Sequence, residues 1–446
     1  MATASRSCLA PGRPIDAPIT SFPGRYARLL PDLPSLECDD DALLALGVAA
    51  AVPDDEMADG AGAAGWPVFG QLVAHDITAD RSPLTTRADV DSIGNARSPR
   101  ANLECLYGDG PVGSPFLYSR GDPAKLLAAG HDVPRNSEGT ALLGDPRNDV
   151  HQLITQLHVL LIAAHNRVVD DLRAGGIAEA DCFEAARRAT TWHYQWIVVH
   201  DFLRRLVGPE LVEELLDAGP TWYRPGPVSY IPFEFADAAF RYGHSQMRQT
   251  YRLNDALEPL SLFPDLLGFG PVAPARRIDW SLFFDRAGRE PAQRAKRIDG
   301  RLPRALVELP AAITGDVELE GYRSLAGRDL QRGFGLGLPS GEAVARAFGE
   351  EPLDADELGL RDAYGWTAET PLWLYVLKEA QARGDGDRLG PVGGRIVAEV
   401  LIGIIGNDPG SYLAVEPGWR PKLAAADGTF GMAQLLDAIE ATTAAT

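Results

Sequence analysis

Residues 144–172, GDPRNDVHQLITQLHVLLIAAHNRVVDDL, contain the strongest helical pattern in the chain. Apolar side chains recur there at intervals of three and four residues, which is the period of one face of an α-helix. The Gly175–Gly176 pair that follows is a typical helix end. We therefore predict a long amphipathic helix over about 150–173, whose apolar face consists of positions 153, 154, 157, 160, 161, 164, 168 and 172.

Weaker patterns on either side of this segment predict a mainly α fold. A short helix is expected at 66–77, WPVFGQLVAHDI, followed by a polar loop that runs to about residue 145. The other expected helices cover 41–52, 178–206, 233–249, 303–313, 340–349, 368–384 and 392–406. Residues 1–62 are rich in Pro, Asp and Ala, and we expect them to form an extended arm around a single helical domain of residues 63–446.

Composition excludes several classes of function. The chain has 446 residues and a net charge of −20, which argues against a general role in binding nucleic acid or anionic lipid. Its four cysteines include no CxxC pair that would predict a zinc or redox site. We find no secretion signal and no apolar run long enough to span a membrane, so we expect a cytoplasmic protein. The scarcity of Lys relative to Arg indicates a bacterial source.

The histidines fall into two groups. His151, His158 and His165 lie seven residues apart on the predicted long helix, as do His193 and His200 on the next one. Metal sites on helices favour spacings of three or four residues, so we interpret these five as histidines packed along helices.

Two other histidines have neighbours that suit chemistry. His75 follows Gln71 by one helical turn, and His244 follows Arg241 by about the same distance. Each one alone is more typical of a buried core histidine than of an active site.

Six segments, taken in order, resemble segments of the animal-type haem peroxidases, the peroxidase–cyclooxygenase superfamily. They spread over about residues 66–410. They are WPVFGQLVAHDIT for the distal helix, RSPRANLECLYGDGP for the loop after it, GDPRNDVHQLITQLHVLLIAAHNRVVDDL for the distal arginine segment, FEFADAAFRYGHS for the proximal helix, GRDLQRGFGLGLPSGEAVAR for its supporting segment and LGPVGGRIVAEVLIGIIGNDPGSYL for the closing helix.

This resemblance implies roles for individual residues. His75 falls on the distal acid–base histidine, Gln71 on the distal amide and Arg147 on the distal arginine. His244 falls on the axial ligand of the haem iron. Two further arginines, Arg241 and Arg332, match positions that pair with haem propionates, and the alternative for both is an ordinary salt bridge.

The chain departs from the family pattern around the haem. Ala74 and Val150 stand where the mammalian members have acids that esterify haem, so we expect non-covalent haem b. His151 stands where one member attaches a Met to haem. Asp329 replaces the Asn that supports the proximal histidine, and it either supports His244 or pairs with its neighbours Arg328 and Arg332.

The resemblance also implies a calcium loop after the distal helix. The matching positions are Asp76, Ser98, Asn102, Glu104 and the backbone carbonyl of Arg100, all of which supply the hard oxygen that calcium prefers. Asn102 stands where Asp is usual. The alternative is an ion-free loop in which Arg97 or Arg100 satisfies Asp76.

The function implied is that of a peroxidase that uses hydrogen peroxide to oxidise a small organic donor or a halide through a high-valent iron-oxo intermediate, for example in a bacterial biosynthetic pathway. The first alternative is a haem-dependent fatty-acid dioxygenase, whose radical tyrosine lies three residues before the proximal histidine. Arg241 holds that position here, and Tyr242 would point about 100° away on a helix. The second alternative is a non-catalytic interaction module on the same fold.

Overall fold

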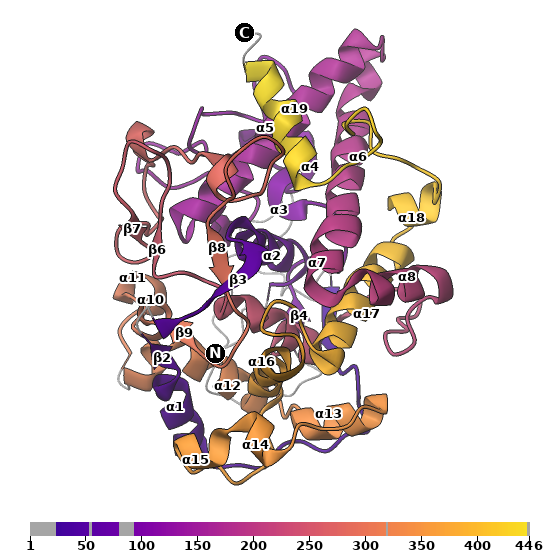
Figure 1. Cartoon of the computed structure of the whole chain (residues 1–446). Coiled ribbons are helices and arrows are strands. Elements are labelled where there is room, and N and C mark those ends of the chain that lie inside the picture. The colour runs from indigo at the N-terminus through magenta and orange to yellow at the C-terminus, as the bar shows by residue number, and fades with distance from the viewer. Residues whose placement is uncertain (1–23, 53–55, 80–92, 318–319, 444–446) are drawn as a thin grey trace, which may run out of the picture.

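The computed structural model describes residues 24–52, 56–79, 93–317 and 320–443. Helices dominate it, which confirms the mainly α class (Figure 1). The α-helices are α1 Asp40–Ala49, α2 Gly65–Ile77, α3 Glu104–Tyr107, α4 Gly110–Gly113, α5 Gln152–Ala174, α6 Glu179–Ile197, α7 Arg204–Val207, α8 Pro209–Ala218, α9 Phe233–Ala236, α10 Arg304–Val307, α11 Ala311–Thr314, α12 Leu325–Gly335, α13 Gly341–Phe348, α14 Ala355–Leu358, α15 Leu360–Tyr364, α16 Leu372–Arg383, α17 Pro391–Asn407, α18 Tyr412–Val415 and α19 Met432–Thr443.

The strands are short and tie distant segments together. β1 lies between β4, to which it is antiparallel, and β5, to which it is parallel; β2 pairs with β9, β3 with β8 and β6 with β7. Their bounds are β1 Gly24–Ala27, β2 Ala51–Val52, β3 Asp59–Ala63, β4 Gly94–Asn95, β5 Ile231–Pro232, β6 Thr250–Tyr251, β7 Leu260–Ser261, β8 Arg294–Lys296 and β9 Leu302–Pro303.

Strand pairing attaches the described part of the expected arm to the rest of the chain. After β1, the backbone N–H groups of Leu29 and Leu30 donate hydrogen bonds of 2.8 and 3.1 Å to the carboxylate of Glu234, which is fully buried. A buried carboxylate needs such donors, because its desolvation is otherwise costly. Residues 1–23 lie outside the described residues, and the boundary of the arm at residue 62 stays a prediction.

Helix α2 lies near the middle of the molecule (Figure 1). Its apolar residues Phe69, Leu72 and Val73 are at most 1% exposed. It contacts both α5 and the 3₁₀-helix η6, Ala239–His244. These contacts bring its polar residues near the distal and proximal segments that the sequence identified.

The long helix predicted at 150–173 is α5. The ring Nδ1 of His151 accepts a hydrogen bond from the backbone N–H of Ile154 and caps its first turn. The helix ends before Gly175 and Gly176, as expected. His151, His158 and His165 are all buried along it, which fits the interpretation that they pack along a helix.

Three expected helices are interrupted. The helix expected at 178–206 passes from α6 into the π-helix η5, Val198–Leu203, and then into α7. The one at 233–249 is broken into α9 and η6, with Ala238 between them at φ −139°, ψ −83°. The one at 303–313 is broken into α10 and α11, because Pro310 has no N–H to continue the ladder. Within the described residues, no helix combines the length and the apolarity that crossing a membrane requires.

Buried histidines make the stability of this fold sensitive to acid. Burial lowers the pKa of His165 to about 4, although its hydrogen bond to the carbonyl of Ala124 opposes the shift. A folded-state pKa below the ordinary 6.5 contributes stability that is present above pH 6.5 and lost as the pH falls toward 4. Glu379 changes the stability in the opposite direction with pH. Burial raises its pKa to about 7, so the stability that it contributes is lost as the pH rises.

We expect His165→Gln to reduce the acid sensitivity of the protein. Between pH 7 and pH 5, the free energy of unfolding should fall by about 2 kcal/mol less in this variant than in the wild type. Denaturant titrations at the two pH values measure the difference. Glu379→Gln is the control of opposite sign, since the same acidification should cost that variant more than the wild type. Equal losses in His165→Gln and wild type would contradict the neutral state of the buried imidazole.

Candidate functional site

One cavity brings together five of the seven residues predicted around the haem. It has a volume of about 550 Å³ and lies between α2, the 3₁₀-helix η4 (Pro146–Asp149) and η6. Gln71, His75, Arg147, Arg241 and His244 all line it. Segments separated by more than 160 residues along the chain therefore meet at one site, as the resemblance implied.

The distal wall is built on α2, where Gln71, Ala74, His75 and Thr78 lie on the face that lines the cavity. The Nδ1 atom of His75 is 2.8 Å from Oδ1 of Asn148. Because an amide oxygen only accepts hydrogen bonds, Nδ1 carries the proton and Nε2 is left free as a base.

A second histidine fixes the orientation of Asn148. The amide nitrogen of Asn148, which is fully buried, donates to Nδ1 of His158 across 3.1 Å. Burial lowers the pKa of His158 to about 4, so this imidazole is neutral near pH 7 and able to accept the bond. The amide oxygen of Asn148 is thereby directed to His75.

The electrostatic environment keeps His75 neutral as well. Burial, reinforced by the positive charge of Arg147, lowers the pKa of His75 to about 3. At neutral pH the ring is therefore an uncharged acceptor at Nε2, which is the state needed to take a proton.

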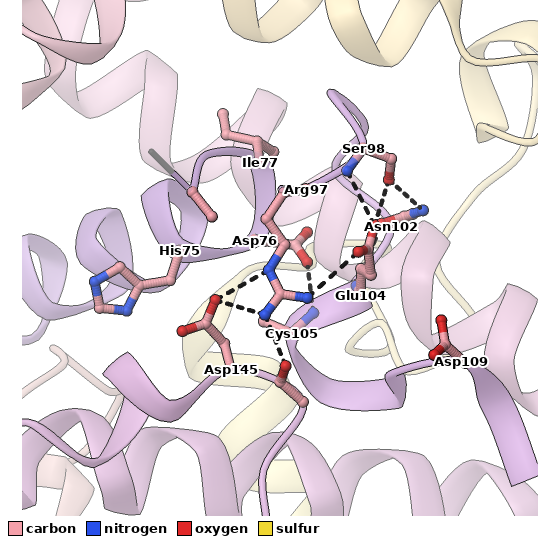
Figure 2. Close-up of polar contacts among 12 residues, drawn as sticks. His75, Asp76, Ile77, Arg97, Ser98, Asn102, Glu104, Cys105, Asp109 and Asp145 are labelled. Atoms are coloured by element: carbon pink, nitrogen blue, oxygen red, sulfur yellow. Dashed lines mark hydrogen bonds and ion pairs between the residues drawn. The ribbon is translucent and has the colours of Figure 1, made fainter. Parts of the chain in front are cut away.

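Arg147 lies next to His75 and is bound to a buried carboxylate. Its Nε and Nη2 atoms donate to Asp145 across 3.0 and 2.8 Å, and Nη2 also reaches the backbone carbonyls of His75 and Thr78. Arg97 also donates to Asp145, through Nε and Nη2 (Figure 2). Burial opposes ionisation of Asp145, but the hydrogen bonds and charges of the two arginines outweigh it and hold the pKa of this carboxyl below its ordinary value.

Gln71 is oriented by His151. The Nε2 atom of His151 is 2.8 Å from Oε1 of Gln71, and Nδ1 of the same ring caps α5. Since Nδ1 accepts, Nε2 carries the proton and donates to the amide oxygen. His151, interpreted from spacing as a packed histidine, therefore also lines the cavity and positions a distal residue.

The proximal side is organised by Asp329, which is fully buried. Its Oδ2 atom is 2.5 Å from Nδ1 of His244, and its Oδ1 atom accepts a bond of 2.9 Å from Arg241. The sequence left open whether Asp329 supports His244 or pairs with Arg328 or Arg332. Asp329 binds His244, and the arginine that donates to it is Arg241 rather than Arg328 or Arg332.

Arg241 and Arg332 share a second buried carboxylate. Both donate to Oδ1 of Asp237, across 3.1 and 2.7 Å. Arg241 lines the cavity, whereas the described lining does not include Arg332. The pairing of these arginines with haem propionates stays a prediction.

The residues of the expected calcium loop lie close together but bind one another. Asp76, at the end of α2, accepts backbone N–H groups of Leu103 and Cys105. Glu104 accepts hydrogen bonds from Ser98 and from Arg97 (Figure 2). Arg100 lies 3.7 Å from Asp408, so neither Arg97 nor Arg100 satisfies Asp76 as the ion-free alternative expected.

The cavity residues fit a haem group. Its volume lies within the range of ~300–1,000 Å³ that is usual for cofactor pockets. Arg147 and Arg241 supply positive charge for an anionic cofactor, and no described lining residue is Asp or Glu. His244 is held through Nδ1, so Nε2 is the atom available to bind iron. Ala74 and Val150 both line the cavity, and neither supplies a carboxylate.

Sequence reasoning missed the residues that act behind this wall. Asn148, Asp145 and Asp237 each bind a predicted site residue, and His158 binds Asn148; none of the four lines the cavity. Asn148 and Asp145 flank Arg147 in the quoted segment, and this proximity was the one signal available. Nothing in the spacing indicated that Asp237 and His158 would reach the site.

Comparisons with known proteins agree with this geometry. Residues 113–265 match the family model of animal haem peroxidases. Heme peroxidase 2 of Caenorhabditis elegans is 24% identical over 296 residues, which are 62% of this chain and 40% of that protein. Human myeloperoxidase is 24% identical over 300 residues, 62% of this chain and 38% of that protein. The chain thus spans less than half the length of these relatives.

Solved structures show the same fold over nearly the whole chain. Peroxidase A of Dictyostelium discoideum superimposes with a TM-score of 0.66 at 15% identity, covering 94% of this chain and 92% of that one. A fatty acid alpha-dioxygenase of Arabidopsis thaliana gives a TM-score of 0.62 at 14% identity, covering 87% and 74%. The chain is thus similar to the animal haem peroxidases: residues 113–265 match their family model, the relatives named above align with more than half of the chain, and the fold is that of solved structures of this kind.

Proposed function

We propose that the protein is a hydrogen peroxide-dependent haem peroxidase that oxidises a small organic donor or a halide, with haem b bound non-covalently. One observation carries the proposal: a neutral imidazole, His75, and a carboxylate-supported imidazole, His244, line the same cavity. A non-catalytic module would have no need to keep both, together with Arg147.

Haem bound in the cavity would supply the iron that reacts with peroxide and the oxidising equivalents that a donor then removes. His75 would accept a proton at Nε2 from one oxygen of hydrogen peroxide and return it to the other as water leaves. Arg147, held by Asp145, would stabilise the negative charge that grows on the leaving oxygen. Both groups are positioned before peroxide arrives.

Asp329 would set the basicity of the proximal ligand. The hydrogen bond from His244 Nδ1 to a carboxylate is charge-assisted and stronger than a bond to an amide. It gives the imidazole more anionic character at Nε2. Arg241 on the other oxygen of Asp329 moderates this effect, because it shares the negative charge.

Two phenylalanines in the cavity lining favour an organic donor. Phe263 and Phe269 line the cavity, and Phe269 is 51% exposed although its backbone has a positive φ of 62°. A bulky residue is rarely found in this region of backbone space. Two hydrogen bonds hold the turn, from Gly268 N–H to the carbonyl of Val150 and from Phe269 N–H to that of Asp149. An aromatic surface is thus presented next to the distal segment.

Fatty-acid dioxygenation is the second candidate, because the fold matches that of fatty acid alpha-dioxygenases and Tyr242 lines the cavity. Tyr242 follows the position of the radical tyrosine by one residue, and consecutive residues of the 3₁₀-helix η6 lie about 120° apart, so Tyr242 points in a different direction although it lines the cavity. Arg241 nevertheless occupies the position of the radical tyrosine. Oxygen uptake with a long-chain fatty acid, in the absence of peroxide, would support the dioxygenase, whereas peroxide-dependent oxidation of a phenol supports the peroxidase.

We expect His75→Ala to retain haem but to slow the peroxide-induced change of the Soret band by a factor of about 10²–10⁴, because positioned proton transfer contributes that much. Asn148→Ala should slow it less, since the base remains but its orientation is lost. Stopped-flow absorbance measures both rates. His165→Gln is the matched control, a buried histidine outside the cavity lining that should leave the rate unchanged. A rate for His75→Ala within a factor of a few of wild type would remove His75 from the mechanism.

Acid–organic extraction of the wild-type protein should release all of the haem as protoheme, because Ala74 and Val150 offer no carboxylate to a haem methyl. Val150→Glu adds a carboxylate to the cavity wall, so after incubation with peroxide some haem should remain attached to that variant. Chromatography of the extract, followed at the haem absorbance, separates the two cases. Covalent haem in the wild type would show that the assignments around Arg147 are displaced.

Asp329→Asn should make the reduction potential of the bound iron more positive, because an amide accepts a weaker bond from His244 than a carboxylate does. Asp237→Asn is the matched control: it alters the same arginine network without touching His244. Spectroelectrochemical titration measures both potentials. A shift in Asp237→Asn as large as that in Asp329→Asn would assign the effect to the arginines instead of the imidazole.

A further inference from the structure

We propose that Arg97 is an internal cation that takes the place of calcium in the distal loop and positions Arg147, so that the distal site forms without a metal ion. This inference concerns the loop behind the cavity and does not depend on which donor the enzyme oxidises.

The side-chain oxygens expected to bind calcium are already engaged by protein donors. Both oxygens of Asp76 accept backbone N–H groups, from Leu103 at 2.9 Å and from Cys105 at 3.2 Å. Ser98 donates its hydroxyl to Glu104 at 2.6 Å. The oxygen of Asn102 accepts the N–H of Glu104 at 3.2 Å. Calcium takes six to eight oxygens, so its entry would break several of these bonds at once. The residues as arranged do not fit the ion.

The guanidinium of Arg97 lies among these groups (Figure 2). Arg97 is 8% exposed and donates Nε and Nη2 to Asp145 at 3.0 and 2.6 Å, Nη2 to the carbonyl of Gly144 at 2.7 Å and Nη1 to Glu104 at 3.3 Å. Burial disfavours its charge, but Asp145 outweighs burial and raises the pKa of Arg97. A planar fork of fixed donors suits carboxylates that converge from two segments.

The charges in the cluster balance without a metal ion. Arg97 and Arg147 carry two positive charges against the carboxylates of Asp145 and Glu104. Asp76 is served by the backbone amides of Leu103 and Cys105. A divalent cation added here would leave an excess of positive charge in a buried place, where unpaired charge is costly.

Arg97 also determines where Arg147 lies. Asp145 is 2% exposed and accepts bonds from both arginines. Arg147 in turn binds the carbonyl of His75 at 3.0 Å. Hydrogen bonds therefore run from Arg97 through Asp145 to Arg147. They connect the loop at residue 97, the distal arginine segment and the end of α2. This chain of hydrogen bonds identifies Arg97 as a positioning residue.

Calcium analysis of the haem-loaded wild-type protein tests the proposal directly. After dialysis against metal-free buffer we expect no stoichiometric calcium. Neither millimolar calcium nor a chelator should shift the thermal midpoint or the Soret band. One calcium per chain, or a thermal midpoint that rises with added calcium, would overturn the proposal without affecting the proposed peroxidase function.

Arg97→Ala tests the positioning role. We expect a thermal midpoint several degrees lower and a severalfold slower Soret response to peroxide, with both partly restored by Arg97→Lys. Free guanidinium at millimolar concentration should accelerate the response of Arg97→Ala, which a purely structural defect would not allow. Arg100→Ala is the matched control, because Arg100 lies in the same loop with a side chain that is 51% exposed. An Arg97→Ala protein that responds to peroxide as the wild type does would contradict the proposal.

Discussion

Two histidines line one cavity, and the partner of each Nδ1 atom is what makes them chemically different. His75 donates to a neutral amide, Asn148, and stays an uncharged base at Nε2. His244 donates to a buried carboxylate, Asp329, which makes its Nε2 more electron-rich and, under the proposed function, a stronger ligand for iron. If the two partners were exchanged, the base would be held by a negative charge and the ligand would lose electron density. The rest of the structure keeps these two partners in place.

Buried carboxylates hold the charged side chains beside the two histidines. Asp145 holds Arg147 beside His75, and Asp237 holds Arg241 beside Asp329. In both cases the acid lies behind the wall and the arginine lines the cavity. A chain with a net charge of −20 thereby presents a cavity whose described lining contains arginines and histidines but no acid. This charge separation suits an anionic cofactor, and it requires that each buried acid be paired.

The local pattern of the sequence predicted the helices that follow one face. α5 and α17 appear within a few residues of their expected bounds, because their apolar side chains repeat with the helical period over many turns. The proximal segment was expected as one helix and is two short ones. Arg241 donates there to the backbone carbonyl of Ala236, which a continuous helix would use in its own hydrogen-bond ladder. The apolar period of a sequence describes only one face of a helix. It therefore does not predict which side chains compete for the hydrogen bonds of the helical ladder.

By itself, the sequence determined the mainly α class, the long helix expected over about 150–173 and, through its ordered motifs, the identity of His75, Arg147 and His244 as candidates. These follow from local spacing and from residue types that the chemistry requires. Only the tertiary structure decided that Asp329 binds His244 rather than Arg328 or Arg332, that Asn148 and His158 orient His75, and that Arg97 lies among the loop carboxylates. The reason is physical: each of these is a choice among several hydrogen-bond partners, and burial decides it by making every unpaired donor or acceptor costly.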